Sequence, residues 1–234
     1  MIKHLSFDLW LTLIKSNPQF KQQRAELIAQ RYNPMGLSTS AIFNIIQCID
    51  RASDRLNEIS GTKLSTLRMY HAILKRLGYR LTDITPALLN DIKHCVNDLF
   101  FQYPPCLLNN HIKEMLLTLK NEGYTMNISS NTGFIEGVYV QKVLASLGID
   151  HCFNFTIYSD QINASKPSPR FFEAVHALVG CEKLQVLHIG DNPKADVAGA
   201  KSFGFLALLI ENPNYSIDFI RFHIDEKNRE LQCI

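Results

Sequence analysis

The segment that decides the fold lies near the N-terminus and reads Lys3-His4-Leu5-Ser6-Phe7-Asp8-Leu9-Trp10-Leu11-Thr12-Leu13. Its first five residues predict a short β-strand, and Asp8 follows directly at the carboxyl end of that strand. In open α/β sheets, ligands gather outside the carboxyl ends of the strands. Asp8 is therefore a candidate nucleophile or metal ligand, with Thr12 four residues later. The simpler alternative is an aspartate that only caps the end of a strand.

The composition is that of an ordinary globular protein. The chain has 234 residues, of which 46% are hydrophobic and 20% charged, and its net charge is +2. No run of Lys or Arg occurs, so nucleic acid is not an expected partner. No signal peptide or membrane-spanning stretch is visible, which predicts a cytoplasmic protein without membrane association. The six cysteines have no CxxC spacing and are predicted to be buried, reduced thiols: Cys48, Cys95, Cys106, Cys152, Cys181 and Cys233.

The chain then divides into two parts of different character. Residues 15–102 predict helix after helix and no strand, with helices at 17–32, 38–60 and 65–77 and another that opens at Thr85-Pro86. Beyond Tyr103-Pro104-Pro105 the pattern alternates. Helices are predicted at 111–121, 134–147, 168–179 and 196–203, and strands at 124–129, 153–158, 185–189 and 205–210. The tail from Asn212 is polar and mixed, and its Ile217, Phe219, Ile220 and Phe222 are candidates for packing on the domain edge.

This rhythm predicts the fold class. Alternating strands and helices form a parallel sheet with helices on both faces, which the first strand most simply joins. We therefore expect an α/β, doubly wound, Rossmann-like core made of residues 1–14 and 103–234. Residues 15–102 form an all-helical domain inserted after the first strand.

Polar side chains follow each of the core strands that should meet at one sheet edge. Asp8 and Thr12 follow the first, Ser129-Ser130-Asn131-Thr132 end the second, Lys166-Pro167 comes after the third, and Gly190-Asp191-Asn192 with Asp196 follows the fourth. A carboxylate nucleophile, hydroxyl donors, a fixed cation and a second pair of carboxylates are the parts that phosphoryl transfer needs. The sequence therefore indicates a phosphoryl-transfer site at this edge.

These motifs resemble the haloacid dehalogenase superfamily. The resemblance rests on FDLWLTL (7–13), NISSNTG (127–133), SKPSPRFF (165–172) and HIGDNPKADVAGAKSFG (188–204), in this order along nearly the whole chain. It implies that the inserted helices are a cap over the active site. It also implies that Asp8 is an aspartyl nucleophile and that Mg²⁺ is held by Asp8, Asp191 and the backbone carbonyl of Trp10. Asp196 would support the metal site or enter it.

The same resemblance assigns the phosphate contacts. Ser130 and Lys166 would bind the phosphate, and both are counted with Asp8 as catalytic. A strand-end hydroxyl for Ser130 and an exposed loop lysine for Lys166 are the alternatives. Thr12 and Asn131 are also predicted to contact the substrate or its phosphate. Asn131 is expected to orient Asp8 or the substrate, and Thr12 to donate to the Asp8 carboxylate or cap a helix. Asn192 is expected to shape the metal loop from outside it, or to be only a turn residue.

Trp10 departs from the family pattern. Most phosphatases of this family carry an acidic residue two positions after the nucleophile, and Trp has no proton to exchange. Three hypotheses follow. In the first, the enzyme hydrolyses small phosphorylated molecules that have good leaving groups, or a residue of the cap supplies the missing acid. The candidates for that residue are His71, Asp83, His94 and Asp98. Alternatively, the protein is a degenerate member that binds a phosphorylated ligand or a partner protein.

The third hypothesis is dehalogenation. The family's dehalogenases also carry an aromatic residue at this position, because halide needs no proton. They lack the Gly-Asp of the last motif, however, which this chain retains as Gly190-Asp191. Because crowded carboxylates repel one another without a cation, the retained acids favour a metal-dependent phosphatase. The sequence itself favours no particular substrate and no oligomeric state.

Overall fold

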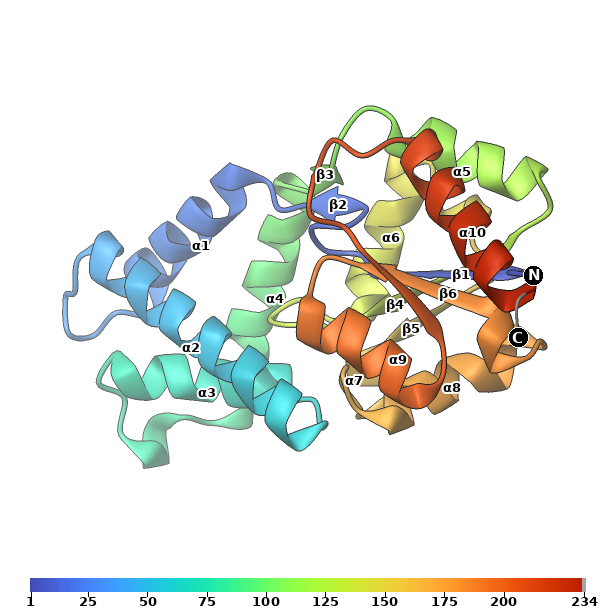
Figure 1. Ribbon diagram of the computed structural model, residues 1–234. Helices are drawn as coiled ribbons and strands as arrows, with labels where there is room; N and C mark the ends of the chain where they lie inside the picture. The colour runs from blue at the N-terminus through green and yellow to red at the C-terminus, as the bar shows by residue number, and fades with distance from the viewer. Residues whose placement is uncertain (233–234) are drawn as a thin grey trace.

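The structure is a computed structural model that describes residues 1–232 (Figure 1). Its main sheet is parallel, in the order β5-β4-β1-β6-β7. The strands are β1 (His4–Phe7), β4 (Thr125–Ser130), β5 (Phe155–Tyr158), β6 (Val186–Gly190) and β7 (Leu206–Leu209). Each lies within about two residues of its predicted position. The N-terminal strand is central, because it pairs with β4 on one side and β6 on the other. The predicted α/β, Rossmann-like class is confirmed.

Helices cover both faces of this sheet. In Figure 1, α5 (Ile112–Asn121) and α10 (Ile217–Gln232) lie above the sheet, whereas α8 (Pro169–Val179) and α9 (Gly199–Phe203) lie below it. Two apolar clusters match these layers. One joins α5, α6 (Gly137–Leu147) and α10 to Leu5, Phe7 and Ile128 of the strands. The other joins α8 and α9 through Phe172, Ala200 and their neighbours. The sheet therefore has its own core on each side.

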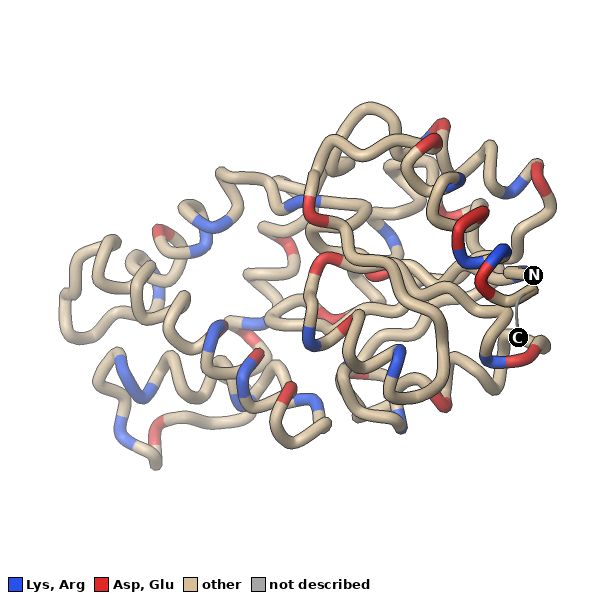
Figure 2. Tube along the Cα trace, viewed as in Figure 1, with Lys and Arg blue, Asp and Glu red and all other residues tan. Residues whose placement is uncertain are grey.

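The inserted segment forms four helices beyond the carboxyl ends of the strands (Figure 1). They are α1 (Pro18–Arg31), α2 (Thr39–Ser60), α3 (Thr66–Arg76) and α4 (Pro86–Gln102). Each begins where the sequence offers a cap, because the side chains of Asn17, Ser38, Ser65 and Thr85 accept backbone N–H groups of the first turn. Figure 2 shows acidic and basic residues interspersed over both parts of the chain.

Several local expectations were wrong. The helical segment was expected to contain no strand, but β2 (Ile14–Lys15) pairs antiparallel with β3 (Cys106–Leu107). This pair ties together the two points where the chain leaves and re-enters the α/β part. The tail forms the regular helix α10, on which Ile220 is buried but Phe222 is exposed. Short elements were also missed: α7 (Ser159–Ile162), η1 (Leu81–Asp83), η2 (Asp150–Cys152) and η3 (Lys183–Gln185).

The helix predicted at 196–203 begins earlier and with a different geometry. Residues Pro193–Ala198 form a π-helical turn, labelled η4, and α9 follows it. Of the five cysteines within residues 1–232, only Cys152 is buried, and Cys48 and Cys106 are exposed, so the expectation that the thiols are all buried was wrong. Cys233 lies outside the described residues. No helix within residues 1–232 is long and apolar enough to cross a membrane. The cytoplasmic location and the absence of nucleic-acid partners stay predictions.

The turn after β1 stores backbone strain at Leu11. This residue adopts a φ of 60°, in the left-handed region, and its side chain is 57% exposed. The turn is closed by hydrogen bonds from Leu11 N to Ile14 O (2.8 Å) and from Leu13 N to Leu9 O (2.9 Å). A left-handed conformation costs a residue with a Cβ about 1–2 kcal/mol, whereas glycine adopts it freely.

We expect Leu11→Gly to stabilise the protein. The relief of strain exceeds the added freedom of glycine in the unfolded chain, so the net gain is ~0.5–1 kcal/mol, or about 1–4 °C in Tm. Urea unfolding measures it. Leu56→Gly, on the exposed face of α2, is the control and should lose stability instead. A loss of stability in Leu11→Gly would mean that the Leu11 side chain packs usefully despite its exposure.

Candidate active site

The centre of the site is the buried ammonium group of Lys166, a residue with only 1% of its surface exposed. Its Nζ donates to Asp8 Oδ1 (2.7 Å), to Asp196 Oδ1 (2.6 Å) and to the backbone oxygen of Ser129 (2.6 Å). Three separate strand ends therefore meet on one cation. Because a buried charge is costly unless paired, both carboxylates are needed to keep Lys166 charged in this position.

Asp196 is the better stabilised of the two carboxylates. Burial opposes its ionisation, but the Lys166 charge and a hydrogen bond with His188 Nε2 (3.1 Å) outweigh burial and hold the pKa of Asp196 below its ordinary range. Its second oxygen accepts the backbone N–H of Asn192 (3.0 Å). Both oxygens of Asp196 are thus occupied by protein donors, which suits a residue that supports the site.

The charged form of Asp8 is the less well stabilised of the two carboxylates. Burial raises its pKa to about 7 against the opposing charge of Lys166, and the Asp196 charge adds to the rise. Its Oδ2 accepts the Thr12 hydroxyl (3.2 Å), from the turn that follows β1. The pKa values of Asp8 and Asp196 shift in opposite directions although both touch Lys166. The reason is that Asp196 accepts additional hydrogen bonds from His188 and Asn192, whereas burial of Asp8 outweighs the effect of the Lys166 charge.

A line of polar side chains crosses the sheet beneath this site and was not recognised in the sequence as a unit. His188 Nδ1 contacts Ser6 Oγ (3.1 Å), and Ser6 Oγ contacts Ser129 Oγ (2.9 Å). Asn127 Nδ2 continues the line by donating to Ser129 Oγ (2.9 Å). All four residues are fully buried on neighbouring strands. His188 is indeed a core histidine rather than a ligand, but it also fixes the Asp196 carboxylate from below.

The loop after β4 holds the Lys166 segment in place. Asn131 Nδ2 donates to the Lys166 backbone oxygen (3.0 Å), and Asn131 Oδ1 accepts the Lys166 backbone N–H (2.9 Å). Asn131 therefore positions Lys166 rather than Asp8. The Ser130 hydroxyl donates to the Asn131 backbone oxygen (3.2 Å), and Ser130 is not among the described residues that line the cavity. Phosphate binding by Ser130 and substrate contact by Thr12 and Asn131 stay predictions.

The donor set at this edge fits a divalent cation. Oxygens of Asp8, Asp191 and Asp196 lie within 4.8 Å of one another. Burial first, and then the Asp196 charge, raise the pKa of Asp191 to about 6. Within residues 1–232, the Asp191 carboxylate accepts no hydrogen bond from another side chain. Carboxylate oxygens are the ligands that Mg²⁺ prefers, and a cation between Asp8 and Asp191 would relieve the repulsion between them.

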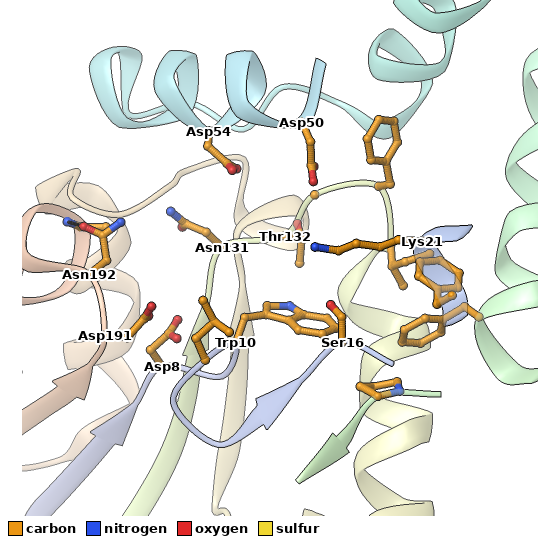
Figure 3. A pocket seen from close by; sticks show the side chains of 18 of the residues that line it. Asp8, Trp10, Ser16, Lys21, Asp50, Asp54, Asn131, Thr132, Asp191 and Asn192 are labelled. Carbon is orange, nitrogen blue, oxygen red and sulfur yellow. Dashed lines mark hydrogen bonds between the residues drawn. The ribbon is translucent and has the colours of Figure 1, made fainter. Parts of the chain in front are cut away.

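A cavity of about 470 Å³ opens onto these carboxylates and is closed on its far side by the inserted helices. Figure 3 shows Asp8 and Asp191 together at one end, with Asp50 and Asp54 of α2 pointing toward the cavity from the opposite wall. Lys21 of α1 points into it from the side. Asn192 links the two parts of the chain, since its Nδ2 donates to Glu58 Oε1 (3.3 Å) while its Oδ1 caps the following turn.

The candidate proton donors predicted on the inserted helices do not face the site. His71, Asp83, His94 and Asp98 are not among the described residues that line the cavity, whereas Asp50, Asp54 and Glu58 are. Their spacing of four residues on α2 places these three on one helix face, a signal that the sequence contained. The Trp10 indole is half-buried, and Figure 3 shows it pointing away from Asp8 toward Ser16. Trp10 therefore lines the cavity without covering the nucleophile.

Comparisons with known proteins establish the family of this chain. Residues 6–210 match the model of the haloacid dehalogenase-like hydrolase family, and the chain belongs to that family. A phosphoglycolate phosphatase of Haemophilus influenzae is 30% identical over 221 residues, which is 92% of this chain and 88% of that protein. A glyceraldehyde 3-phosphate phosphatase of Methanothermobacter thermautotrophicus is 27% identical over 121 residues, or 51% of this chain, and the match spans only half (50%) of that protein.

Solved structures share the fold. A HAD phosphatase from Thermococcus onnurineus superposes with a TM-score of 0.64 at 23% identity, over 92% of this chain and 88% of that one. An L-2-haloacid dehalogenase from Xanthobacter autotrophicus gives a TM-score of 0.60 at 21% identity, over 90% and 78% of the two chains. At these identities the likeness establishes the fold alone. The family match makes this chain a haloacid dehalogenase-like hydrolase, and the two curated relatives above are named as phosphatases.

Proposed function

We propose that the protein is a Mg²⁺-dependent phosphatase that acts on a small phosphorylated molecule through a phosphoaspartate on Asp8. The observation that carries the proposal is the buried contact of Lys166 with Asp8 and Asp196, beside the Asp191 carboxylate at the cavity, which accepts no hydrogen bond from another side chain within residues 1–232. Relatives named as phosphatases of phosphoglycolate and of glyceraldehyde 3-phosphate support a small phosphate ester as substrate.

The reaction has two steps. A carboxylate oxygen of Asp8 attacks phosphorus, and the bond from phosphorus to the leaving oxygen breaks with its electron pair going to that oxygen. Water then attacks the phosphorus of the phosphoaspartate and gives up a proton to solvent, the bond from phosphorus to Asp8 breaks with its electron pair returning to the carboxylate, and inorganic phosphate leaves. Lys166 supplies a fixed positive charge beside the equatorial oxygens, and it is already oriented by Asp196 and Ser129.

The metal would be held by Asp8, Asp191 and the backbone carbonyl of Trp10. Mg²⁺, when bound, polarises the phosphoryl group and offsets the repulsion between the phosphate and the carboxylates. Replacement of the usual acid by Trp10 does not remove this site, because a main-chain carbonyl does not depend on the side chain. Asp196 keeps the role of a supporting residue, since its oxygens already accept three hydrogen bonds from Lys166, His188 and Asn192.

Trp10 restricts the substrates. Without an acid at this position, esters with good leaving groups should react well, and unactivated esters need a proton from elsewhere. The acids that face the cavity from the inserted helices are those of α2. The pKa of Asp54 is raised to about 6, first by its partly enclosed setting and then by the charges of Asp50 and Glu58. We therefore propose that residues 15–102 act as the cap and that Asp54 is its best-placed proton donor.

The test is hydrolysis of an aryl phosphate and of acetyl phosphate, with and without Mg²⁺. We expect turnover that depends on Mg²⁺, and a loss of ~10⁴-fold or more in Asp8→Asn, because the amide cannot act as the nucleophile. Asp191→Asn should weaken the binding of Mg²⁺ and so raise the Mg²⁺ concentration that half-maximal turnover requires. The matched control is Asp98→Asn on the exposed face of α4, which should behave like the wild type. Equal turnover in Asp8→Asn and wild type would remove Asp8 as the nucleophile.

One observation favours a second candidate. Trp10 is an aromatic residue where the family's dehalogenases also have one, and the chain shares its fold with L-2-haloacid dehalogenase. Hydrolysis of a carbon–halogen bond by Asp8 would need no metal. If neither phosphate ester is turned over, release of halide from 2-chloropropanoate without Mg²⁺ decides for this candidate. If no halide is released, a degenerate protein that binds a phosphorylated ligand or a partner is the remaining hypothesis.

A further inference from the structure

Arg24 is a buried cation that the proposed reaction does not use. It lies on α1 and lines the cavity, yet only 6% of its surface is exposed. Its Nε has no hydrogen-bond partner, and no carboxylate within residues 1–232 forms an ion pair with its guanidinium. An arginine carries five N–H donors, and the buried Nε–H donor is costly to leave without a partner. The cavity is therefore where a partner for Arg24 has to come from.

The position of Arg24 is fixed by aromatic rings. Its guanidinium carbon lies 4.7 Å from the centre of the Phe134 ring and 5.3 Å from that of Phe20. Phe20 is one turn earlier on α1, and Phe134 comes from the loop after β4, beside Asn131 and Thr132. Such cation–π contacts hold the planar group in one orientation but satisfy none of its N–H donors. The guanidinium is thus held in place for a ligand that approaches from the cavity.

The charges around the cavity select the ligand. Lys21, on the same side of the cavity, also points into it (Figure 3). The neighbouring helix α2 carries Asp50 and Asp54, which also line the cavity. Burial lowers the pKa of Arg24, and the charge of Asp50 opposes that effect and favours the charged guanidinium. A group bound at Arg24 must therefore be anionic, but a second phosphate would bring two charges toward the acidic wall. A carboxylate carries one charge and matches the fork of a guanidinium with two parallel hydrogen bonds.

We infer that Arg24 binds a carboxylate of the substrate, and that the substrates of this protein are phosphorylated carboxylic acids. The inference rests on the proposed function, because it assigns the end of the substrate that is remote from the phosphate. Arg24 determines substrate specificity by binding the carboxylate, and it takes no part in the transfer of the phosphoryl group. The acids of α2 contribute by disfavouring ligands with a second dianionic group.

The test measures binding, so that it does not depend on turnover. Affinities of the wild type in Mg²⁺ are compared by calorimetry for ω-phosphonocarboxylates of two to four carbons and for the alkylphosphonates of equal length. We expect the carboxylate to improve affinity by about 10- to 100-fold at one chain length or more, which is the value of a charge-assisted hydrogen bond. Arg24→Met should abolish this ratio, and Arg24→Lys should keep only part of it, because Lys lacks the fork.

The controls separate the two proposals. Arg31→Met, on the last turn of the same helix and outside the cavity lining, should keep the full ratio. Because the ratio compares two ligands on one protein, a general loss of stability in Arg24→Met cancels, and Arg24→Lys retains a cation if Met does not fold. No advantage for the carboxylate at any length, or an equal advantage in the Arg24 variants, overturns the inference. Failure of aryl phosphate hydrolysis would instead contradict the proposed phosphatase, whatever the affinities show.

Discussion

Trp10→Asp is expected to accelerate the hydrolysis of unactivated alkyl phosphates by about 10²–10⁴-fold. That range is the usual contribution of a general acid–base residue, which this chain lacks at the position where most phosphatases of its family have one. The Trp10 indole already points aside from Asp8, so its removal exposes no new surface of the nucleophile (Figure 3). A new carboxylate at residue 10 would reach the leaving oxygen and then activate water against the phosphoaspartate.

The measurement is kcat for an alkyl phosphate and for acetyl phosphate in the same preparations. The gain should be much smaller for acetyl phosphate, since its leaving group needs no proton. Trp10→Phe is the matched control, because it keeps an aromatic ring and supplies no acid. A similar gain in Trp10→Phe would show that space, not proton transfer, limits the wild type. A loss of activity in Trp10→Asp would mean that the indole itself is needed.

Lys166→Met is expected to damage both activity and stability. Removal of the cation leaves Asp8 and Asp196 buried without their partner, and breaking a buried ion pair in this way costs about 3–5 kcal/mol. The rate should fall by ~10²–10³-fold, the usual effect of removing one charge-stabilising donor from an active site. Urea unfolding and aryl phosphate hydrolysis measure the two effects, and Lys201→Met, an exposed lysine on α9, is the control.

The loss of stability in Lys166→Met should depend on pH. The folded protein already holds the pKa of Asp8 at about 7, above the ordinary value of 3.8, so it binds more protons than the unfolded chain between these values. Stability therefore falls as pH rises through this window. Without Lys166 the fall should be steeper, because two buried carboxylates then lack their cation. The difference between variant and wild type is expected to be smaller at pH 5 than at pH 8. A difference that is constant across this range would mean that Lys166 contributes packing rather than charge.

Much of this molecule follows from its sequence alone. The strand that ends at Asp8, the four helices after it and the alternation after Tyr103 all have local signals in hydrophobic period, caps and glycine stops. Lys166 and Asp196 were also found at the right strand ends, because the carboxyl ends of parallel strands must meet at one edge. The pair β2–β3 was missed, since strands of two residues leave no periodic pattern.

Tertiary structure alone decided how those residues act together. The hydrogen bonds of Asn131 go to the backbone of Lys166, and His188 supports Asp196 through a buried polar line that runs across separate strands. The acids of the inserted helices that face the cavity are those of α2, and the cation to which we assign a ligand is Arg24 on α1. Which face of an inserted helix meets the site depends on how the helices pack over the sheet. That packing is set by contacts between residues far apart in the chain. The hydrophobic period of each helix therefore predicts its apolar face, but it does not predict which of its polar residues line the cavity.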